Sequence, residues 1–430
     1  MTQPDPALAE WSLLKKLLVC FFFIFFVLYI FLNPNEVIPY SFYLHKIYIE
    51  PSNRLIVWLA TDVFHFVNPA VKFYNGTVDT VFAYLAVLFI AFIAIAGSIL
   101  WVRIGGNAID YRRIYNTLII ILRYFMAITW IAYGSIKIIK LQFPDISPVM
   151  LLKTYGDSTP KELAWAFMGY STGFNYFIGF VEYAVGLLLF FRRTSTLGNI
   201  IGVGILANVV AFNYSFDDNI KLLSTILLLM TLFLLSKDLK RLTDFFWGKK
   251  IIHPMDEQPA YFKEKWKNTT LLTAKIAFIL YLIFFDLHGD VARARQTEAN
   301  IIKSPLYGIY NVTVFIRNKD ILNPLTTDTI RWKKLIIAAP GDNAAIMLMN
   351  DSVKRFALKT DIRAKKMELI YKTAPFDKYT FIYNGLKNGA LLLHGKYRAD
   401  SLEVQLQRYD INKLPLINSR FRWVLDHNFK

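Results

Sequence analysis

The chain has 430 residues, of which 55% are hydrophobic and 16% aromatic, and its formal net charge is +17. Its apolar residues lie in long runs separated by short basic loops, the pattern of helices that satisfy their own backbone hydrogen bonds in lipid. The single cysteine, Cys20, excludes a disulfide framework and a CxxC redox or zinc motif. Composition therefore predicts an integral membrane protein and argues against a soluble enzyme.

The first apolar run, 17–32, is longer than a signal-peptide core needs to be, and no small-residue cleavage site follows it. We expect it to be retained as a membrane span. Further spans are expected near 80–102, 115–138, 173–191, 197–213, 222–235 and 270–286. At about 1.5 Å per residue, the fifth and sixth lie at or below a hydrocarbon core of roughly 30 Å, so their ends must extend into flanking residues.

Lysine and arginine crowd against alternate ends of these spans, and cytoplasmic loops are the ones that retain positive charge. The basic regions are Lys15–Lys16, Arg103 to Arg113, Arg192–Arg193 and 236–268. With seven spans, this pattern predicts an N-terminus inside and a C-terminal domain outside. The stretch 55–73 is apolar enough to suggest another span, but Asp62, His65, Asn68 and Pro69 interrupt it. We interpret it as an amphipathic helix on the outer surface.

Beyond the last span the composition changes to short alternating strands separated by turn residues. The sequence therefore predicts a transmembrane helical domain, 1–287, and an extracytoplasmic all-β domain, 288–430. Strands are expected at 308–317, 329–338, 344–349, 353–359, 366–372, 378–383, 390–397 and 402–407. A meander of eight strands can close into a small antiparallel barrel, filled by side chains or holding one small ligand. An open sheet against the membrane is the alternative.

The β domain is strongly basic. From Gly289 onward it has 24 Lys and Arg against 13 Asp and Glu. Membrane lipids, anionic lipid head groups or another acidic envelope partner fit such a surface. Nucleic acid is not expected as a partner, because a domain outside the cell rarely meets it. A solvated basic surface without a specific partner stays open as the alternative.

Polar residues in the bundle are the candidates for a site, because ionisable groups in spans are costly unless they face a partner or water. The candidate ligand-binding residues are Lys137, Glu182, Asn208, Asn213, Asp217 and Lys221. Counted from the outer helix ends at about 1.5 Å per residue, the first three lie at depths compatible with one outward-facing cavity. Glu182 is then a proton acceptor or ligand anchor, with Lys137 as its charge partner and both as catalytic candidates. A buried ion pair that only fixes helix packing is the alternative.

Signatures of familiar enzyme classes are absent from the sequence. HExxH, GxSxG, a Walker lysine loop and a dinucleotide glycine fingerprint do not occur, and the six histidines show no metal-ligand spacing. No metal site is therefore predicted.

One part of the chain resembles a known family. The residues that carry the resemblance are Tyr133-Gly134-Ser135-Ile136-Lys137, Leu141-Gln142-Phe143-Pro144, Tyr155-Gly156-Asp157-Ser158, Phe167-Met168-Gly169, Gly179-Phe180-Val181-Glu182, Arg192-Arg193-Thr194 and the stretch from Asn208 to Lys221. Together they resemble the DoxX-like bacterial membrane proteins, which are built on a four-helix membrane core. Larger members look similar over the outer domain, including Asp328 to Trp332 and Met349 to Ser352. The ending Phe421-Arg422-Trp423 departs from the family pattern.

The resemblance implies a bacterial cytoplasmic (inner) membrane, with the β domain in the periplasm. It also implies quinone as a candidate ligand, since the family is similar in outline to the small subunit of thiosulfate:quinone oxidoreductase. The first hypothesis is accordingly a lipophilic small molecule bound at an outward-facing pocket around Glu182. The second is an envelope assembly or maintenance factor whose basic β domain binds a lipid or protein. The third is a membrane transferase or carboxylase-like enzyme that uses Lys137 or Glu182 as a base.

Overall fold

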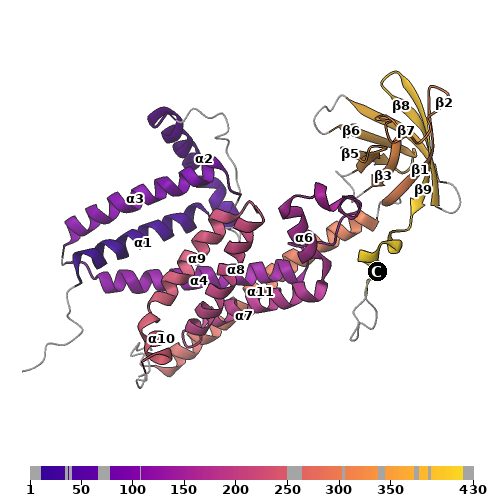
Figure 1. Ribbon diagram of the computed structural model, residues 1–430. Helices are drawn as coiled ribbons and strands as arrows, with labels where there is room; N and C mark the ends of the chain where they lie inside the picture. The colour runs from indigo at the N-terminus through magenta and orange to yellow at the C-terminus, as the bar shows by residue number, and fades with distance from the viewer. Residues whose placement is uncertain are drawn as a thin grey trace, which may run out of the picture. The chain divides into compact units, whose positions relative to one another are not determined.

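The computed structural model describes residues 11–33, 37, 41–65, 78–106, 108–248, 264–302, 306–337, 344–371, 377–385 and 389–419. The chain folds into two compact units, one made of 1–144 with 159–291 and the other of 145–158 with 292–430. The first unit is helical and the second is mostly β (Figure 1). The boundary at 291/292 lies close to the predicted one, but the segment 145–158, which we expected in the helical domain, belongs to the β unit.

Six helices in the described part of the chain are long and apolar enough to cross a membrane. They are α1 (Leu13–Leu32), α3 (Val81–Gly105), α4 (Tyr111–Ile138), α7 (Thr172–Phe190), α8 (Ser195–Ser215) and α11 (Lys265–Ile302). A shorter helix, α9 (Lys221–Ser236), is followed after a 69° bend by α10 (Leu239–Phe246), and this pair makes a seventh candidate span. The predicted membrane bundle of about seven spans is thereby confirmed, with α9 as short as expected.

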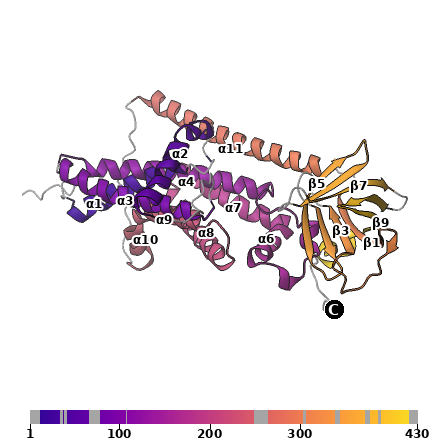
Figure 2. The ribbon, with the colours of Figure 1, turned by 90° about the horizontal axis from the view of Figure 1, so that it is seen from above.

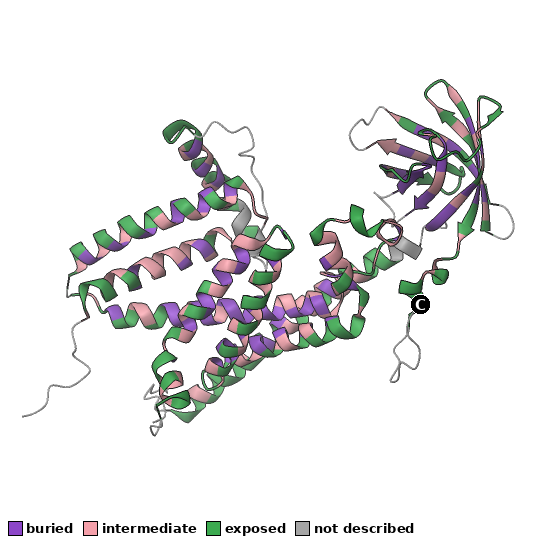
Figure 3. Ribbon diagram, viewed as in Figure 1, coloured by how far each residue is buried: buried purple, intermediate pink, exposed green. Residues whose placement is uncertain are grey.

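Helix α4 lies at the centre of the bundle. In its most apolar window 67% of the residues are buried, against 11% in the window of α11. Figure 3 shows the buried positions concentrated along α4 and the exposed ones on the outer helices. The main apolar core includes Leu122, Met126 and Ile131 of α4 with Leu189 of α7 and Met230 of α9. Helices α1 and α3 run side by side next to this core (Figure 2).

Contacts between helix ends gather several of the basic segments at one end of the bundle. Lys16 of α1 lies over the ring of Tyr111 at the start of α4, with 5.4 Å from Nζ to the centroid. Near the start of α8, the Thr196 hydroxyl donates to Asp238, which follows α9, at 2.7 Å. We call this end of the bundle, with 15–16, 103–113, 192–196 and 236–241, the basic end. At the opposite end, the backbone N–H of Asp79 donates to the carbonyl of Asn219 at 2.7 Å, which joins the start of α3 to the start of α9.

The interrupted apolar stretch 55–73 begins inside a helix that is not one of the candidate spans. Helix α2 (Ser41–Trp58) continues through a π-helical turn, Leu59–Val63. Its Ile56 and the Ala60 of the turn pack against α3, while Leu55 and Trp58 are exposed. The start of the stretch is therefore amphipathic as predicted, and residues 66–73 lie outside the described part of the chain.

The β unit is a closed antiparallel barrel of eight strands, which confirms that prediction. The strands are β1 (Gly308–Arg317), β3 (Trp332–Ile337), β4 (Ala344–Leu348), β5 (Val353–Asp361), β6 (Lys366–Tyr371), β7 (Lys378–Gly385), β8 (Ala390–Tyr397) and β9 (Asp400–Tyr409), with a two-residue strand β2 (Asp320–Ile321) beside β1. Consecutive strands pair, and β1 closes the barrel on β9 from Ile309–Tyr409 to Arg317–Leu402, with a bulge after Val312.

Aromatic side chains fill the barrel, as expected for one of this size. Trp332 is 1% exposed, and its ring packs edge-on against Tyr379 and Phe381 at centroid distances of 5.3 and 5.8 Å. The segment 145–158 contributes α5 (Pro148–Leu151), whose Val149 packs with Ile309 and Ile336. This apolar contact is why the segment belongs to the β unit.

Helix α11 ends later than its apolar sequence does. The span was expected to end at Asp286, but the helix continues to Ile302. Its extension, 287–302, contains Ala, Arg, Gln and Glu, which favour a helix in water as well as in lipid. A change in hydropathy marks the expected edge of the membrane and does not by itself end a helix.

Candidate functional site

Three glycines bring α4 and α7 close together and so set the position of the candidate site. A Cβ added at Gly134 would lie 2.8 Å from the carbonyl oxygen of Gly179, and one added at Gly186 would lie 2.9 Å from that of Ala127. Both distances are too short for any side chain, so small residues are needed here, as in other tightly packed membrane helices. Glu182 follows Gly179 by three residues and precedes Gly186 by four, so it lies on the same face of α7, toward α4.

The charge pair predicted from the sequence is present at this contact. Lys137 Nζ lies 2.7 Å from Glu182 Oε2, and the two side chains are only 8% and 5% exposed. The Lys137 ammonium also lies 5.8 Å from the ring centroid of Tyr133. Because the pair is almost fully removed from solvent, its mutual attraction is screened far less than that of a surface ion pair.

The pair lies in the wall of a cavity of about 580 Å³ within the helical unit. That volume falls within the range of roughly 300–1,000 Å³ that is typical of small-molecule sites. The walls come from α4, α6 (Pro160–Tyr170), α7, α8 and α9. Most of the lining is apolar, and its aromatic members are Trp130, Tyr133, Phe143, Trp165, Phe177 and Phe212.

A second polar cluster lines the same cavity. Lys161 Nζ lies 2.8 Å from Asp218 Oδ1, and Trp165 Nε1 donates to the other carboxylate oxygen at 3.1 Å. Lys161 also donates to the side-chain oxygen of Asn219 at 2.8 Å. Lys161 and Trp165 are four residues apart on α6, which begins with a capping box between Thr159 and Glu162. The capped helix thus holds both side chains on one face.

The turn between α8 and α9 is fixed by polar contacts from two sides. The carboxylate of Asp79 accepts the backbone N–H groups of Lys221 and Leu222 at 2.8 and 2.9 Å, so it caps α9 from a distant part of the sequence. Asn213 is 2% exposed and donates to the Ser224 hydroxyl at 3.0 Å. These contacts hold the part of the cavity wall that the turn provides.

Of the six candidate residues, four line this cavity: Lys137, Glu182, Asn208 and Asn213. The other two, Asp217 and Lys221, are not among its lining residues and pair with each other at 2.7 Å. Asp217 has a positive φ of 52°, so it serves the tight turn, and its side chain is 85% exposed. The hydrogen bond from Lys221 lowers the pKa of Asp217. What any of the six does for function stays a prediction.

The structure adds cavity residues that the sequence argument missed. The indole Nε1 of Trp130 and the side-chain oxygen of Gln142 are buried in the wall and have no hydrogen-bond partner among the described residues. Trp130 lies seven residues before Lys137 on α4, and this two-turn spacing was the signal that could have revealed it. Within the described ranges no group of three or more His, Cys, Asp or Glu could hold a metal ion.

The chain was compared with protein-family models, curated proteins and solved structures to find its family. No protein-family model matches the chain, and no solved structure matches it. Over 124 residues the chain is 37% identical to the uncharacterised protein YwoB of Bacillus subtilis (strain 168), a match that covers 29% of this chain and 79% of YwoB. The chain belongs to the YwoB family. Because YwoB is uncharacterised, this similarity assigns no activity to the chain.

Proposed function

We propose that this YwoB-family chain is a DoxX-like membrane protein that binds a lipophilic small molecule of the quinone class in the cavity beside Lys137 and Glu182. The observation that carries the proposal is a mostly apolar cavity with a buried ion pair in its wall. Apolar sites with a few well-placed polar groups are typical of small-molecule binding. A ligand that spends its time in the bilayer can enter such a site between the helices.

The unpaired polar atoms of the wall support a ligand that can both accept and donate hydrogen bonds. Trp130 Nε1 is a donor, and Gln142 Oε1 is an acceptor. Leaving a buried polar atom unpaired costs about 1–3 kcal/mol, so a ligand that pairs with these atoms gains affinity. A quinone carbonyl accepts from an indole N–H, and the hydroxyl of the corresponding quinol donates to an amide oxygen. One chemical class therefore suits both groups.

The ion pair gives the cavity a charged donor next to its apolar wall. An ammonium group has three N–H donors, and Glu182 accepts one from Lys137 in this structure. A ligand carbonyl that accepts another would form a charge-assisted hydrogen bond. In this proposal Lys137 orients the ligand, while Glu182 holds the ammonium in place and balances its charge.

The proposal is tested by the small molecules that co-purify with the chain. Wild type, Glu182→Gln and Lys137→Met are purified in mild detergent, and their organic extracts are compared by mass spectrometry. The matched control is Asp217→Asn with Lys221→Met, a pair at the same distance but outside the cavity. We expect a lipophilic carbonyl compound in wild type and control that is depleted in both cavity variants. An unchanged profile in folded cavity variants would rule the site out.

The proposal also includes the orientation of the bundle in the membrane and the compartment of the barrel. We place the basic end of the bundle in the cytoplasm, because positive charge is retained there. The cavity, at the opposite end, then opens toward the outside of a bacterial inner membrane, and the barrel lies in the periplasm.

A second function is supported by the outer face of the barrel. Lys359, Glu368, Thr380 and Lys396 are register partners across β5 to β8. Glu368 is shared by Lys366 at 3.0 Å and Lys378 at 3.4 Å, which leaves excess positive charge on this face. In the second proposal this face binds an acidic envelope partner. It predicts that Lys359→Glu with Lys396→Glu abolishes complementation of a gene deletion, whereas Glu182→Gln does not.

A further inference from the structure

A second cavity of about 520 Å³ lies at the basic end of the bundle, between α1, α4 and α9. It is lined by Trp11, Lys15, Leu18, Val19, Phe22, Tyr115, Leu229, Leu232, Phe233 and Ser236. None of these residues lines the cavity beside Glu182. Leu18, Leu229 and Leu232 are 44%, 48% and 42% exposed, so this cavity opens on the side of the bundle that faces lipid.

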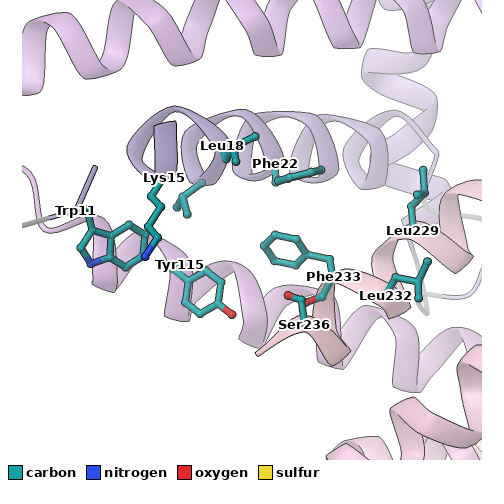
Figure 4. A pocket seen from close by; sticks show the side chains of 10 residues that line it. Trp11, Lys15, Leu18, Phe22, Tyr115, Leu229, Leu232, Phe233 and Ser236 are labelled. Atoms are coloured by element: carbon teal, nitrogen blue, oxygen red, sulfur yellow. The ribbon is translucent and has the colours of Figure 1, made fainter. Parts of the chain in front are cut away.

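The lining is divided along its length. Figure 4 shows Lys15 extending toward Trp11 and Tyr115 at one end, while Leu229 and Leu232 lie at the other. The ring centroids of Trp11 and Tyr115 are 6.2 Å apart, and their planes meet at 64° in an edge-to-face contact. Tryptophan and tyrosine are enriched where hydrocarbon meets head groups, so these rings place the polar end of the cavity at the membrane surface. A molecule that matches this division has a polar head and an apolar tail.

The charge of Lys15 gives the sign of the head. Lysines in the other cavity have carboxylate partners, Glu182 for Lys137 and Asp218 for Lys161. Lys15 forms no ion pair with another described residue. Its neighbour Lys16 adds a second positive charge one residue on, over the ring of Tyr111. An ammonium in this position attracts a phosphate as a point charge.

We propose that this cavity binds an anionic phospholipid of the surrounding membrane. One acyl chain lies along Phe22, Phe233 and Leu229, and the phosphate lies at the Lys15 ammonium beside Trp11. The proposal goes beyond the ligand assigned to the other cavity and does not depend on it. Basic sites between helix ends, flanked by aromatic residues, are where anionic head groups are recognised in membrane proteins.

The head-group interaction is tested on the full chain in detergent by native mass spectrometry with phosphatidylglycerol and phosphatidylcholine. Lys15→Gln is compared with wild type and with Lys240→Gln, which removes an exposed charge from the same end but outside the cavity. For Lys15→Gln we expect about five-fold weaker binding of the first phosphatidylglycerol, since a lysine at the surface contributes roughly that factor. The control should match wild type. Equal binding by Lys15→Gln, or equal affinity of wild type for the two lipids, would overturn the proposal.

The acyl-chain interaction is tested by filling the cavity. Leu229→Trp adds bulk to its wall, and Leu197→Trp adds the same bulk at a similarly exposed position on α8 that does not line it. Both variants are heated with and without phosphatidylglycerol, because a ligand that binds only the folded state raises its melting temperature. We expect the lipid to stabilise wild type and Leu197→Trp but not Leu229→Trp. Equal stabilisation of all three would contradict the placement of the chain.

Discussion

At the scale of residues, Lys137 and Glu182 form an ion pair whose two side chains are both buried. Each side chain alone would be an uncompensated charge in a nearly dry site, since both are less than a tenth exposed. Removing one partner of a buried pair costs about 3–5 kcal/mol, whereas replacing both is often close to neutral. The pair is therefore expected to behave as a unit.

The first prediction is a strongly non-additive mutant cycle. We expect Lys137→Met and Glu182→Gln each to lower the free energy of unfolding, and the double variant to recover much of the loss. Equilibrium unfolding of the purified chain in mixed micelles measures all four corners. The 2.7 Å contact requires the two side chains to compensate each other's charge. Additive single effects would contradict this.

The second prediction concerns acid and the barrel. Hydrogen bonds from Asn318 and Arg317 lower the pKa of Asp400 below its usual value of 3.8. Because the pKa of Asp400 is lower in the folded state, the ionised carboxylate stabilises the barrel fully at pH values above 3.8. This contribution is lost as the pH falls through the folded-state pKa. Asp400→Asn should therefore make β9 less stable than wild type at pH 6, with the difference shrinking below about pH 4. Amide exchange of β9 peptides, compared with wild type at each pH, measures this; a constant difference would contradict it.

At the scale of elements, the close contact of α4 with α7 decides whether the ion pair between Lys137 and Glu182 forms. A Cβ at Gly179 would lie 2.8 Å from Ile138 Cγ1 and 2.9 Å from the Gly134 carbonyl oxygen. The third prediction is that Gly179→Ala lowers the free energy of unfolding by about 1–3 kcal/mol, because overpacking pushes the helices apart.

The control for this prediction is on the same helix. At Gly173 an added Cβ meets no atom within 4 Å, so Gly173→Ala should be neutral or slightly stabilising. Thermal melts of both variants in the same detergent decide the outcome. Equal melting temperatures would show that the glycine contact does not limit the approach of α4 and α7.

The fourth prediction concerns the cap on α9. Asp79→Ala removes the acceptor for two backbone N–H groups and should cost about 0.5–2 kcal/mol, the range for lost N-caps. Asp79→Asn keeps an acceptor and should cost less. Amide exchange at the start of α9 reports the cap directly. Protection there that is the same in Asp79→Ala and in wild type would contradict this role.

The elements that the sequence predicted best are those whose pattern is local. The expected strands 308–317 and 390–397 coincide with β1 and β8, because alternation and turn residues mark both ends. The last span was expected to end at Asp286, whereas α11 continues to Ile302, and 145–158 was expected in the helical domain, whereas it groups with the β unit. The first depends on helix propensity in a polar segment, and the second on contacts such as Val149 with Ile309, which are distant in sequence.

The residues of the candidate site were likewise predicted only in part from the sequence. Depth, counted along the expected spans, grouped Lys137, Glu182 and Asn208, and all three line one cavity in the structure. Depth gave no means of separating Asn213 from Asp217, because it does not show that α8 continues through Asn213 or that Asp217 adopts a positive φ in the turn beyond it. Lys161 and Trp165 lie on a short helix outside the spans, so a search restricted to spans could not find them.

At the scale of the whole molecule, the chain joins a bundle of candidate spans to a closed barrel through one continuous helix, α11. The fifth prediction is that reporter fusions at Gly106, Ser158 and Lys430 give a cytoplasmic signal at the first and an external signal at the other two. One predicted span lies between Gly106 and Ser158, so these two positions are on opposite sides of the membrane. Four predicted spans lie between Ser158 and Lys430, so these two are on the same side. Signal from one side at all three would contradict the proposed topology.

Equilibrium binding of a short-chain benzoquinone to the purified full chain measures whether the cavity beside Lys137 and Glu182 binds a quinone-class ligand. The comparison is between wild type, the double variant Lys137→Met with Glu182→Gln, and the control Asp217→Asn with Lys221→Met. We predict saturable binding in wild type and control that is at least about tenfold weaker in the cavity variant, because a charge-assisted hydrogen bond is lost. Equal affinity in all three would contradict a quinone site in this cavity.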